Sequence, residues 1–216
     1  MPEPRSMTDL PYASHLQAED GTLRQGDQFD VVLFEEVSFD GVRAGNARFT
    51  ESAFTGVDFG NAQLRHGRFN DVWLDNCRMN GTDFAQTTWL DAEFGTTVLA
   101  GTALFDSTMR RADFFGCKLV GTNLRNADLR DVTFTNCVLQ DVDFGEAELT
   151  NVAFPGSRID ALHFDGVKAE NVDFRGASEI DIRSGFDSLK GVRINKVQLL
   201  QLSHAFALAL GVTVDG

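Results

Sequence analysis

The sequence has few cysteines, few basic residues and no long apolar run. Its three cysteines are an odd number without paired spacing, which fits a reducing compartment better than a disulfide framework. No apolar stretch reaches the roughly eighteen residues that a membrane helix needs. The opening MPEPRSMTDLPYASHLQ has neither the apolar core nor the cleavage pattern of a secretory leader. We therefore expect a cytoplasmic protein without a membrane segment.

The shortage of basic residues constrains the partners. The sequence contains 19 Lys and Arg residues and 32 Asp and Glu residues, which gives a formal net charge of −13. Nucleic acids and anionic membranes are polyanions, so this charge opposes direct binding to either. A basic partner is more plausible.

Motifs of catalysis and metal binding are also missing. The four histidines are scattered, and no Cys or His cluster has metal-ligand spacing. The chain has neither a glycine-rich phosphate loop nor a nucleophile motif. We expect no enzymatic activity, no metal and no cofactor.

A period of five residues dominates what the sequence does contain. Every fifth position from Phe29 to Phe174 gives thirty centres, which are fifteen Phe, nine Leu, two Met, one Trp, one Ile, Ala44 and Ala169. The residue two before each centre is mostly small or β-branched, and the residue two after it is often Gly, Asn or Asp. Those three residue types tolerate the unusual φ of a corner.

This period fits neither a helix nor a single strand. A helix brings residues three and four apart onto one face, and a strand brings residues two apart. A chain that turns once every five residues, with its centre pointing inward, instead builds stacked coils, which is a solenoid. Three cysteines share the small inward position on one side of this coil, where they serve best as core fillers: Cys77, Cys117 and Cys137.

The run ADLRDVTFTNCVLQDVDFGEAELTN resembles the pentapeptide repeat proteins. The resemblance implies an all-β fold, a right-handed quadrilateral β-helix with four repeats per coil. Thirty repeats would make about seven and a half coils, and at ~4.8 Å per coil the rod would be roughly 36 Å long. We expect an N-terminal cap at 1–26, the β-helix at 27–176, and a C-terminal cap at 177–216.

The C-terminal segment predicts an α-helix from about Lys196 to Leu210, with Asn195 as N-cap and Gly211 as stop. It is more apolar than one buried stripe needs. In relatives of the gyrase-protecting type such a helix joins two rods end to end. The resemblance therefore implies a homodimer through Leu199, Leu202, Phe206, Ala209 and Leu210. The alternative is a helix that only plugs its own coil.

The negative charge belongs to the repeats. Residues 27–176 hold 24 acidic and 13 basic residues, a net charge of −11. The most acidic side has its centres at Phe34 and every twentieth residue after it. We expect this side to be a partner-binding face, because exposed aromatic residues beside carboxylates are typical of interfaces. Its predicted residues are Glu35, Glu36, Trp73, Asp75, Glu93, Asp113 and Phe115. A solubilising face with stray aromatic residues is the alternative.

The resemblance also implies a function. Members related to the mycobacterial fluoroquinolone-resistance protein bind DNA gyrase, a type IIA topoisomerase, and protect it from poisons by mimicking DNA. The uninterrupted repeats resemble that type, whereas the plasmid-borne quinolone-resistance type has projecting loops. About 36 Å of duplex carries roughly 21 phosphate charges, so this rod would be a dilute mimic. The alternative function is a structural or adaptor scaffold that binds another protein through the acidic, aromatic face.

Overall fold

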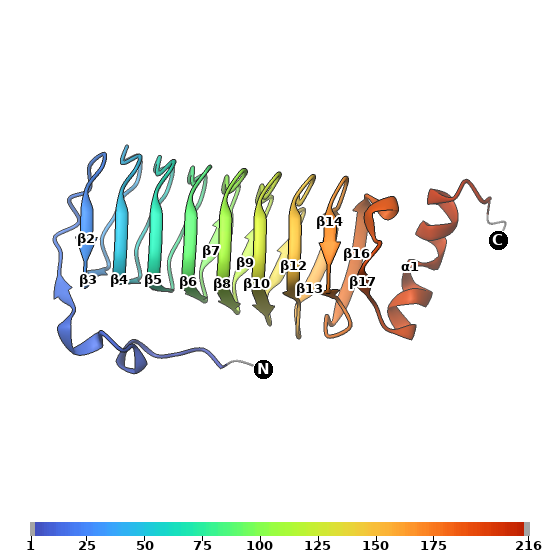
Figure 1. Ribbon diagram of the computed structural model, residues 1–216, viewed down its shortest axis with the longest axis horizontal. Coiled ribbons are helices and arrows are strands. Elements are labelled where there is room, and N and C mark those ends of the chain that lie inside the picture. The colour runs from blue at the N-terminus through green and yellow to red at the C-terminus, as the bar shows by residue number, and fades with distance from the viewer. Residues whose placement is uncertain (1–2, 214–216) are drawn as a thin grey trace.

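The computed structural model describes residues 3–213 and shows a straight rod of stacked coils with one α-helix at its C-terminal end (Figure 1). Neighbouring strands are parallel, and between residues 28 and 173 their paired residues lie twenty apart, as in Arg48 with Arg68 and Thr108 with Asp128. Twenty residues are four pentapeptides, so each coil has four sides. The predicted β-helix with a C-terminal helical cap is confirmed.

Two adjoining sides form one long sheet, and a third side forms a shorter one. The long sheet contains β1 (Gln17–Ala18), β2 (Gln28–Asp30), β3 (Val32–Glu35), β4 (Arg48–Thr55), β5 (Arg68–Asp75), β6 (Thr88–Gly95), β8 (Thr108–Phe115), β10 (Asp128–Thr135), β12 (Glu148–Ala153), β14 (Lys168–Glu170), β15 (Val172–Asp173) and β17 (Val192–Arg193). The shorter sheet contains β7 (Val98–Ala100), β9 (Lys118–Val120), β11 (Val138–Gln140), β13 (Arg158–His163) and β16 (Glu179–Ser184). Isolated parallel bridges, such as Asp83 with Ala103, connect the fourth side.

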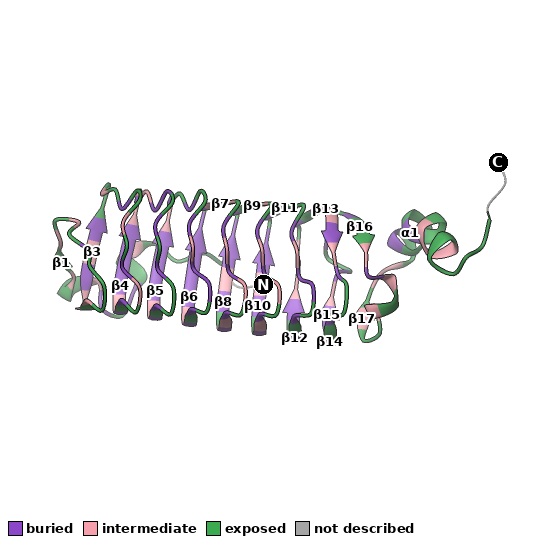
Figure 2. Cartoon of the chain, turned by 90° about the horizontal axis from the view of Figure 1, so that it is seen from above, coloured by how far each residue is buried: buried purple, intermediate pink, exposed green. Residues whose placement is uncertain are grey.

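The predicted centres are buried inside the rod, except Phe29 and Ala169, which are partly buried. Figure 2 shows buried stretches along the strands of successive coils. Rings twenty residues apart stack face to face: the ring centroids of Phe94 and Phe114 are 4.3 Å apart, and those of Phe114 and Phe134 are 4.7 Å apart. Aromatic pairs at such distances add roughly 0.5–1.5 kcal/mol beyond the burial of their area. The sequence period is therefore the period of one continuous core.

The small inward residues satisfy buried backbone carbonyls. Thr122 Oγ1 donates to the Leu99 carbonyl at 2.9 Å, and Cys137 Sγ lies 3.5 Å from the Phe114 carbonyl. Both donors lie 23 residues after their acceptors. All three cysteines are buried and free, as expected of core fillers, and burial raises the pKa of the Cys77 thiol to about 12.

A left-handed backbone forms the corners. Every fifth residue from Gly26 to Asn171 has a positive φ, and most of these residues are not glycine. Asn and Asp tolerate this conformation, whereas residues with an ordinary Cβ are strained in it. Val31, Thr96 and Ala161 hold it with φ of 55°, 42° and 54°. The stacked coils therefore impose the corner even where the sequence disfavours it.

The ladder extends past both predicted ends of the repeat region. Gly26 N–H already donates to the Gly45 carbonyl at 2.9 Å. At the other end, β16 pairs with β13 through Ile159 and Ile180, which are 21 residues apart instead of the twenty of a regular coil. Val192 then pairs with Val172, again twenty residues apart. The three-part division at 26 and 176 stays a prediction, and its outermost residues, 1–2 and 214–216, lie outside the described part.

Helix α1 (Lys196–Ala209) has the predicted start. The Asn195 side chain accepts from Gln198 N–H at 2.9 Å, and Gln198 Oε1 accepts from Asn195 N–H at 2.9 Å. This capping box fixes the first turn. A short 3₁₀ turn, η3 (Phe186–Ser188), precedes it. Within residues 3–213, the helices are too short to cross a bilayer.

We expect Ala161→Gly to stabilise the rod. Removing the Cβ relieves ~1–2 kcal/mol of left-handed strain, which exceeds the ~0.5–1 kcal/mol of added unfolded-chain entropy. Urea unfolding should show a net gain of roughly 0.5–1 kcal/mol from these two terms. Ala100→Gly at an extended strand end is the control and should lose stability. A loss at Ala161 would show that the corner is not strained.

Candidate partner-binding face

The predicted face is a regular array of two rows of outward side chains. One row runs through Ala53, Trp73, Glu93 and Asp113, which are paired in register on β4, β5, β6 and β8. The second row runs through Asp75, Gly95 and Phe115 on the same strands. The ladder therefore brings the central predicted residues side by side, although they lie twenty residues apart in the chain.

The predicted exposure of this face is wrong for its three central side chains. Trp73, Glu93 and Phe115 are buried, each about 95% covered. Asp75 and Asp113 are half-buried, and only Glu35 and Glu36 are exposed.

Trp73 and Glu93 are covered by the start of the chain, which we call the N-terminal arm (residues 3–16). The arm runs back along the rod from the first coil toward its middle (Figure 1). It contains two 3₁₀ turns, η1 (Met7–Asp9) and η2 (Ala13–His15). The described part of the predicted N-terminal cap therefore lies along the side of several coils.

Arg5 anchors the far end of the arm. Its backbone N–H donates to Glu93 Oε1 at 2.8 Å, and its Nε donates to Glu93 Oε2 at 2.7 Å. The Trp73 indole N–H donates to the Arg5 carbonyl at 3.2 Å. The Glu93 side chain is only 7% exposed, and a buried carboxylate is strongly destabilised without such partners. The Glu93 carboxylate and the Trp73 indole thus hold both the side chain and the main chain of Arg5.

Apolar anchors hold the middle of the arm. Leu10 and Tyr12 are buried against Ala53 and Trp73, and this small cluster is separate from the core inside the coils. The Tyr12 hydroxyl donates to the Asp71 carbonyl at 2.9 Å, and burial raises the pKa of that hydroxyl. The aromatic residue predicted to contact a partner therefore contacts the chain itself.

Electrostatics beside the anchor reflect partial burial. Burial raises the pKa of the Asp113 and Asp71 carboxyls above their ordinary values, although Arg5 opposes the shift at both. Asp91 has a lowered pKa because Arg111 donates to both of its oxygens.

A hollow of about 630 Å³ lies at the far end of the arm. Glu3 and Pro4 line it on the arm, and on the rod it is lined by Asp75, Gly95, Thr96, Phe115, Gly116, Thr135 and Asn136. The Thr135 hydroxyl is buried without a hydrogen-bond partner. This hollow continues the track of the arm along the second row of the face.

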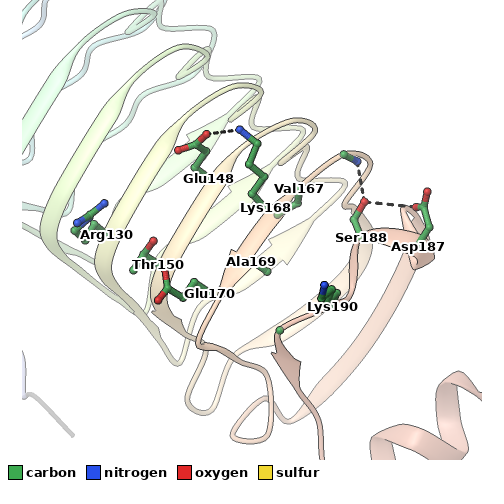
Figure 3. A pocket seen from close by; sticks show the side chains of 12 residues that line it. Arg130, Glu148, Thr150, Val167, Lys168, Ala169, Glu170, Asp187, Ser188 and Lys190 are labelled. Carbon is green, nitrogen blue, oxygen red and sulfur yellow. Dashed lines mark hydrogen bonds and ion pairs between the residues drawn. The ribbon is translucent and has the colours of Figure 1, made fainter.

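A second, shallow hollow lies between the last coils near Ala169, where a small residue replaces a large centre (Figure 3). Its charges are mixed: Arg130, Lys168 and Lys190 stand among Glu148, Glu170 and Asp187. Lys168 Nζ is bonded to Glu148 Oε1 at 2.6 Å. The mixture gives this hollow no preference for a ligand of one sign.

The predicted dimerisation residues divide into two groups. Leu202 is buried against its own rod, and the Phe206 ring lies 5.5 Å from that of Phe186. Leu199, Ala209 and Leu210 are exposed, as are Val197, Leu200, Leu208 and Val212. Helix α1 therefore plugs its own coil and also presents apolar side chains outward.

The rod and its ladder define a class of protein, a repeat solenoid with five-residue repeats. Two family models match the chain: one described as a pentapeptide repeat region at residues 107–183, and one described as pentapeptide repeats in eight copies at residues 34–71. The chain belongs to the pentapeptide repeat family. No curated protein sequence matches it.

Solved structures of similar fold come from different settings. The chain is similar to QnrB1, a plasmid-mediated fluoroquinolone resistance protein, with 16% identity, a TM-score of 0.36, and coverage of 81% of this chain and 99% of that one. It is similar to HetL, involved in heterocyst differentiation regulation in Nostoc sp. strain PCC 7120, with 14% identity, a TM-score of 0.37, and coverage of 80% and 91%.

A third similar structure is a pentapeptide repeat protein of the Arabidopsis thaliana thylakoid lumen, with 23% identity and a TM-score of 0.40. The match covers 59% of this chain and 74% of that one. These likenesses concern the fold alone.

We expect Arg5→Ala to release the arm without melting the rod. Hydrogen bonds to charged groups are worth ~1.5–3 kcal/mol. Because Arg5 is 41% exposed, we take the lower end of that range, which corresponds to roughly tenfold faster amide exchange in residues 5–16. Hydrogen-exchange mass spectrometry measures this rate.

The control is Arg111→Ala, which breaks an exposed pair with Asp91, and exposed pairs contribute little to stability. Equal exchange of the arm in both variants would contradict an anchor at Arg5.

Proposed function

We propose that this chain binds a type IIA topoisomerase, DNA gyrase, as a DNA-mimicking rod and so gives resistance or self-immunity to topoisomerase-poisoning antibiotics. It would act in the cytoplasm, where gyrase works on DNA. What the fold and the family establish is the coarser function of a pentapeptide repeat scaffold.

One observation carries the proposal: the acidic rod is straight and uninterrupted. The twenty-residue register holds from Arg48 to Ala153 without a break along the long sheet, so carboxylates on one side stay in line. A net charge of −11 on residues 27–176 makes this line attractive to a basic groove built for duplex DNA.

Ion pairs reduce the charge that a partner would meet. Many carboxylates of the rod are paired within it, among them Asp83, Asp128 and Glu148. In the described part of the chain, Glu35, Glu36, Asp75 and Asp113 of the predicted face have no ion pair, whereas Glu93 is held by Arg5. Three of these four precede residue 76, so the mimic would be strongest near the N-terminal end of the rod.

The test is DNA supercoiling by purified gyrase, titrated with this protein in the presence and absence of a gyrase poison. We expect rescue from the poison or direct inhibition. Reversing Glu35 and Glu36 to Lys should weaken the effect by roughly tenfold, since charged contacts govern encounter and register.

The matched control reverses Asp106 and Asp165 on the opposite side, which are exposed and have no ion pair in the described part of the chain, and it changes the net charge equally. Equal loss in both variants would point to bulk charge instead of a defined face. No effect of the folded wild-type protein would leave the alternative, an adaptor scaffold for another protein.

We further propose a homodimer in which α1 of one copy packs on α1 of another. Contiguous exposed apolar side chains mark interaction sites, and Leu200 and Leu210 are 74% and 81% exposed. Two rods joined end to end would double the length of the acidic surface.

Leu199→Asp with Leu210→Asp should convert the dimer to a monomer in sedimentation equilibrium and leave the melting temperature of the rod unchanged. The control, Gln201→Asp with Ser203→Asp, adds the same charge at exposed polar positions and should remain dimeric. A wild-type protein that sediments as a monomer at ~100 μM, a ~5 kcal/mol association limit, would exclude this dimer.

A further inference from the structure

The N-terminal arm is bound as a peptide ligand is bound. Between residues 3 and 16 its backbone makes no backbone–backbone hydrogen bond to the rod; such bonds begin only at β1, where Gln17 N–H donates to the Val31 carbonyl. Specific anchors hold the arm instead: Arg5 on Glu93, and Leu10 and Tyr12 beside Trp73. Side-chain anchors in fixed pockets are how grooves recognise extended peptides.

The polar residues between Arg5 and Leu10 form hydrogen bonds with one another. Ser6 and Asp9 are bonded to each other, with the Ser6 hydroxyl 2.7 Å from Asp9 Oδ2, and the hydroxyls of Ser6 and Thr8 are 2.8 Å apart. These three residues are outside the buried set. The surface under the arm, which we call the groove (Ala53, Trp73 and Glu93), therefore contacts the anchors and half-buried Met7, and leaves Ser6, Thr8 and Asp9 free to vary.

The arm can leave without breaking a coil. The chain that connects it to the rod turns at Gly21, whose φ is +84°, and the ladder from Gly26 onward does not depend on the arm. Its departure would uncover Trp73 and Glu93 together. An indole beside a carboxylate is a surface that suits an arginine, through ion pairing and stacking.

We infer that this groove is a recognition site for an arginine-bearing extended segment of a partner protein, which replaces the arm. The segment carries apolar anchors five and seven residues after its arginine, as Leu10 and Tyr12 follow Arg5. The hollow beside Phe115 extends the groove by the residues that precede the arginine. The chain's own arm is the ligand in place when no partner is bound.

This recognition site is independent of topoisomerase binding, because it rests on the contacts of the arm alone. Its test therefore contains no topoisomerase. The probe is a fluorescein-labelled peptide of residues 3–16, EPRSMTDLPYASHL, and the readout is fluorescence anisotropy with the full-length chain.

The peptide should bind full-length Arg5→Ala roughly tenfold or more tightly than wild type, because the weakened arm competes less. Adding Glu93→Gln to Arg5→Ala should abolish binding. A peptide with Arg replaced by Ala should bind at least ~10-fold more weakly, as expected for an anchor residue. Equal binding to wild type and Arg5→Ala, or equal binding of both peptides, would overturn the inference.

A second peptide distinguishes a foreign ligand from another copy of the arm. It keeps only the arginine, leucine and tyrosine at their spacing and scrambles all other residues. Binding within about threefold of the native peptide, under ~1 kcal/mol, supports recognition by anchors. Binding of the native sequence alone would restrict the groove to this chain's own arm, from the same or a second copy, and overturn the inference.

Should Arg5→Ala fail to fold, Leu10→Ala with Tyr12→Ala removes the other anchors of the arm. This variant should then bind the native peptide more tightly than wild type does. Circular dichroism confirms that each variant retains the wild-type strand signal.

Discussion

The hydrogen-bonded register of twenty residues between neighbouring coils determines the rest of the molecule. It exists because the chain turns a left-handed corner every five residues, so four repeats return it to the same side. The register stacks Phe94 on Phe114 and Phe134 inside, and outside it aligns Trp73 with Glu93 and Asp113. The same twenty-residue repeat thus orders both the core and the surface. Each coil contacts only its neighbouring coils.

The fold could be predicted from sequence because the period is both strict and unusual. A centre such as Phe134 needs no knowledge of distant residues, since its environment recurs in every coil. The exception lies after Gly176, where the ladder continues through a coil whose pairing of Ile159 with Ile180 contains one extra residue. A single insertion destroys a sequence period but only bulges a strand, so the extra coil was hidden.

The surface was harder to predict for a physical reason. The repeat places Trp73 and Glu93 outward but carries no information on what covers them. Arg5 lies 88 residues before its partner Glu93, in a segment without the five-residue period. Nothing in MPEPRSMTDLPY indicates which coil this segment contacts. Helix α1 shows the same limit. Its N-cap Asn195 is predictable from the local sequence. Which of its apolar residues pack on the last coil and which are exposed depends on the shape of the end of the rod.

The arm also has a consequence for how the rod comes apart. A solenoid of nearest-neighbour contacts can fray from an end one coil at a time. Here a single segment, the N-terminal arm, starts at the first coil, contacts β4 and β5, and is hydrogen-bonded to Glu93 on β6. The arm therefore connects the first coils to one another. Loss of the first coil would pull against an anchor several coils away. The N-terminal half should therefore open as one cooperative block, with Arg5 as its fastener, while coils beyond the arm retain the freedom to open singly.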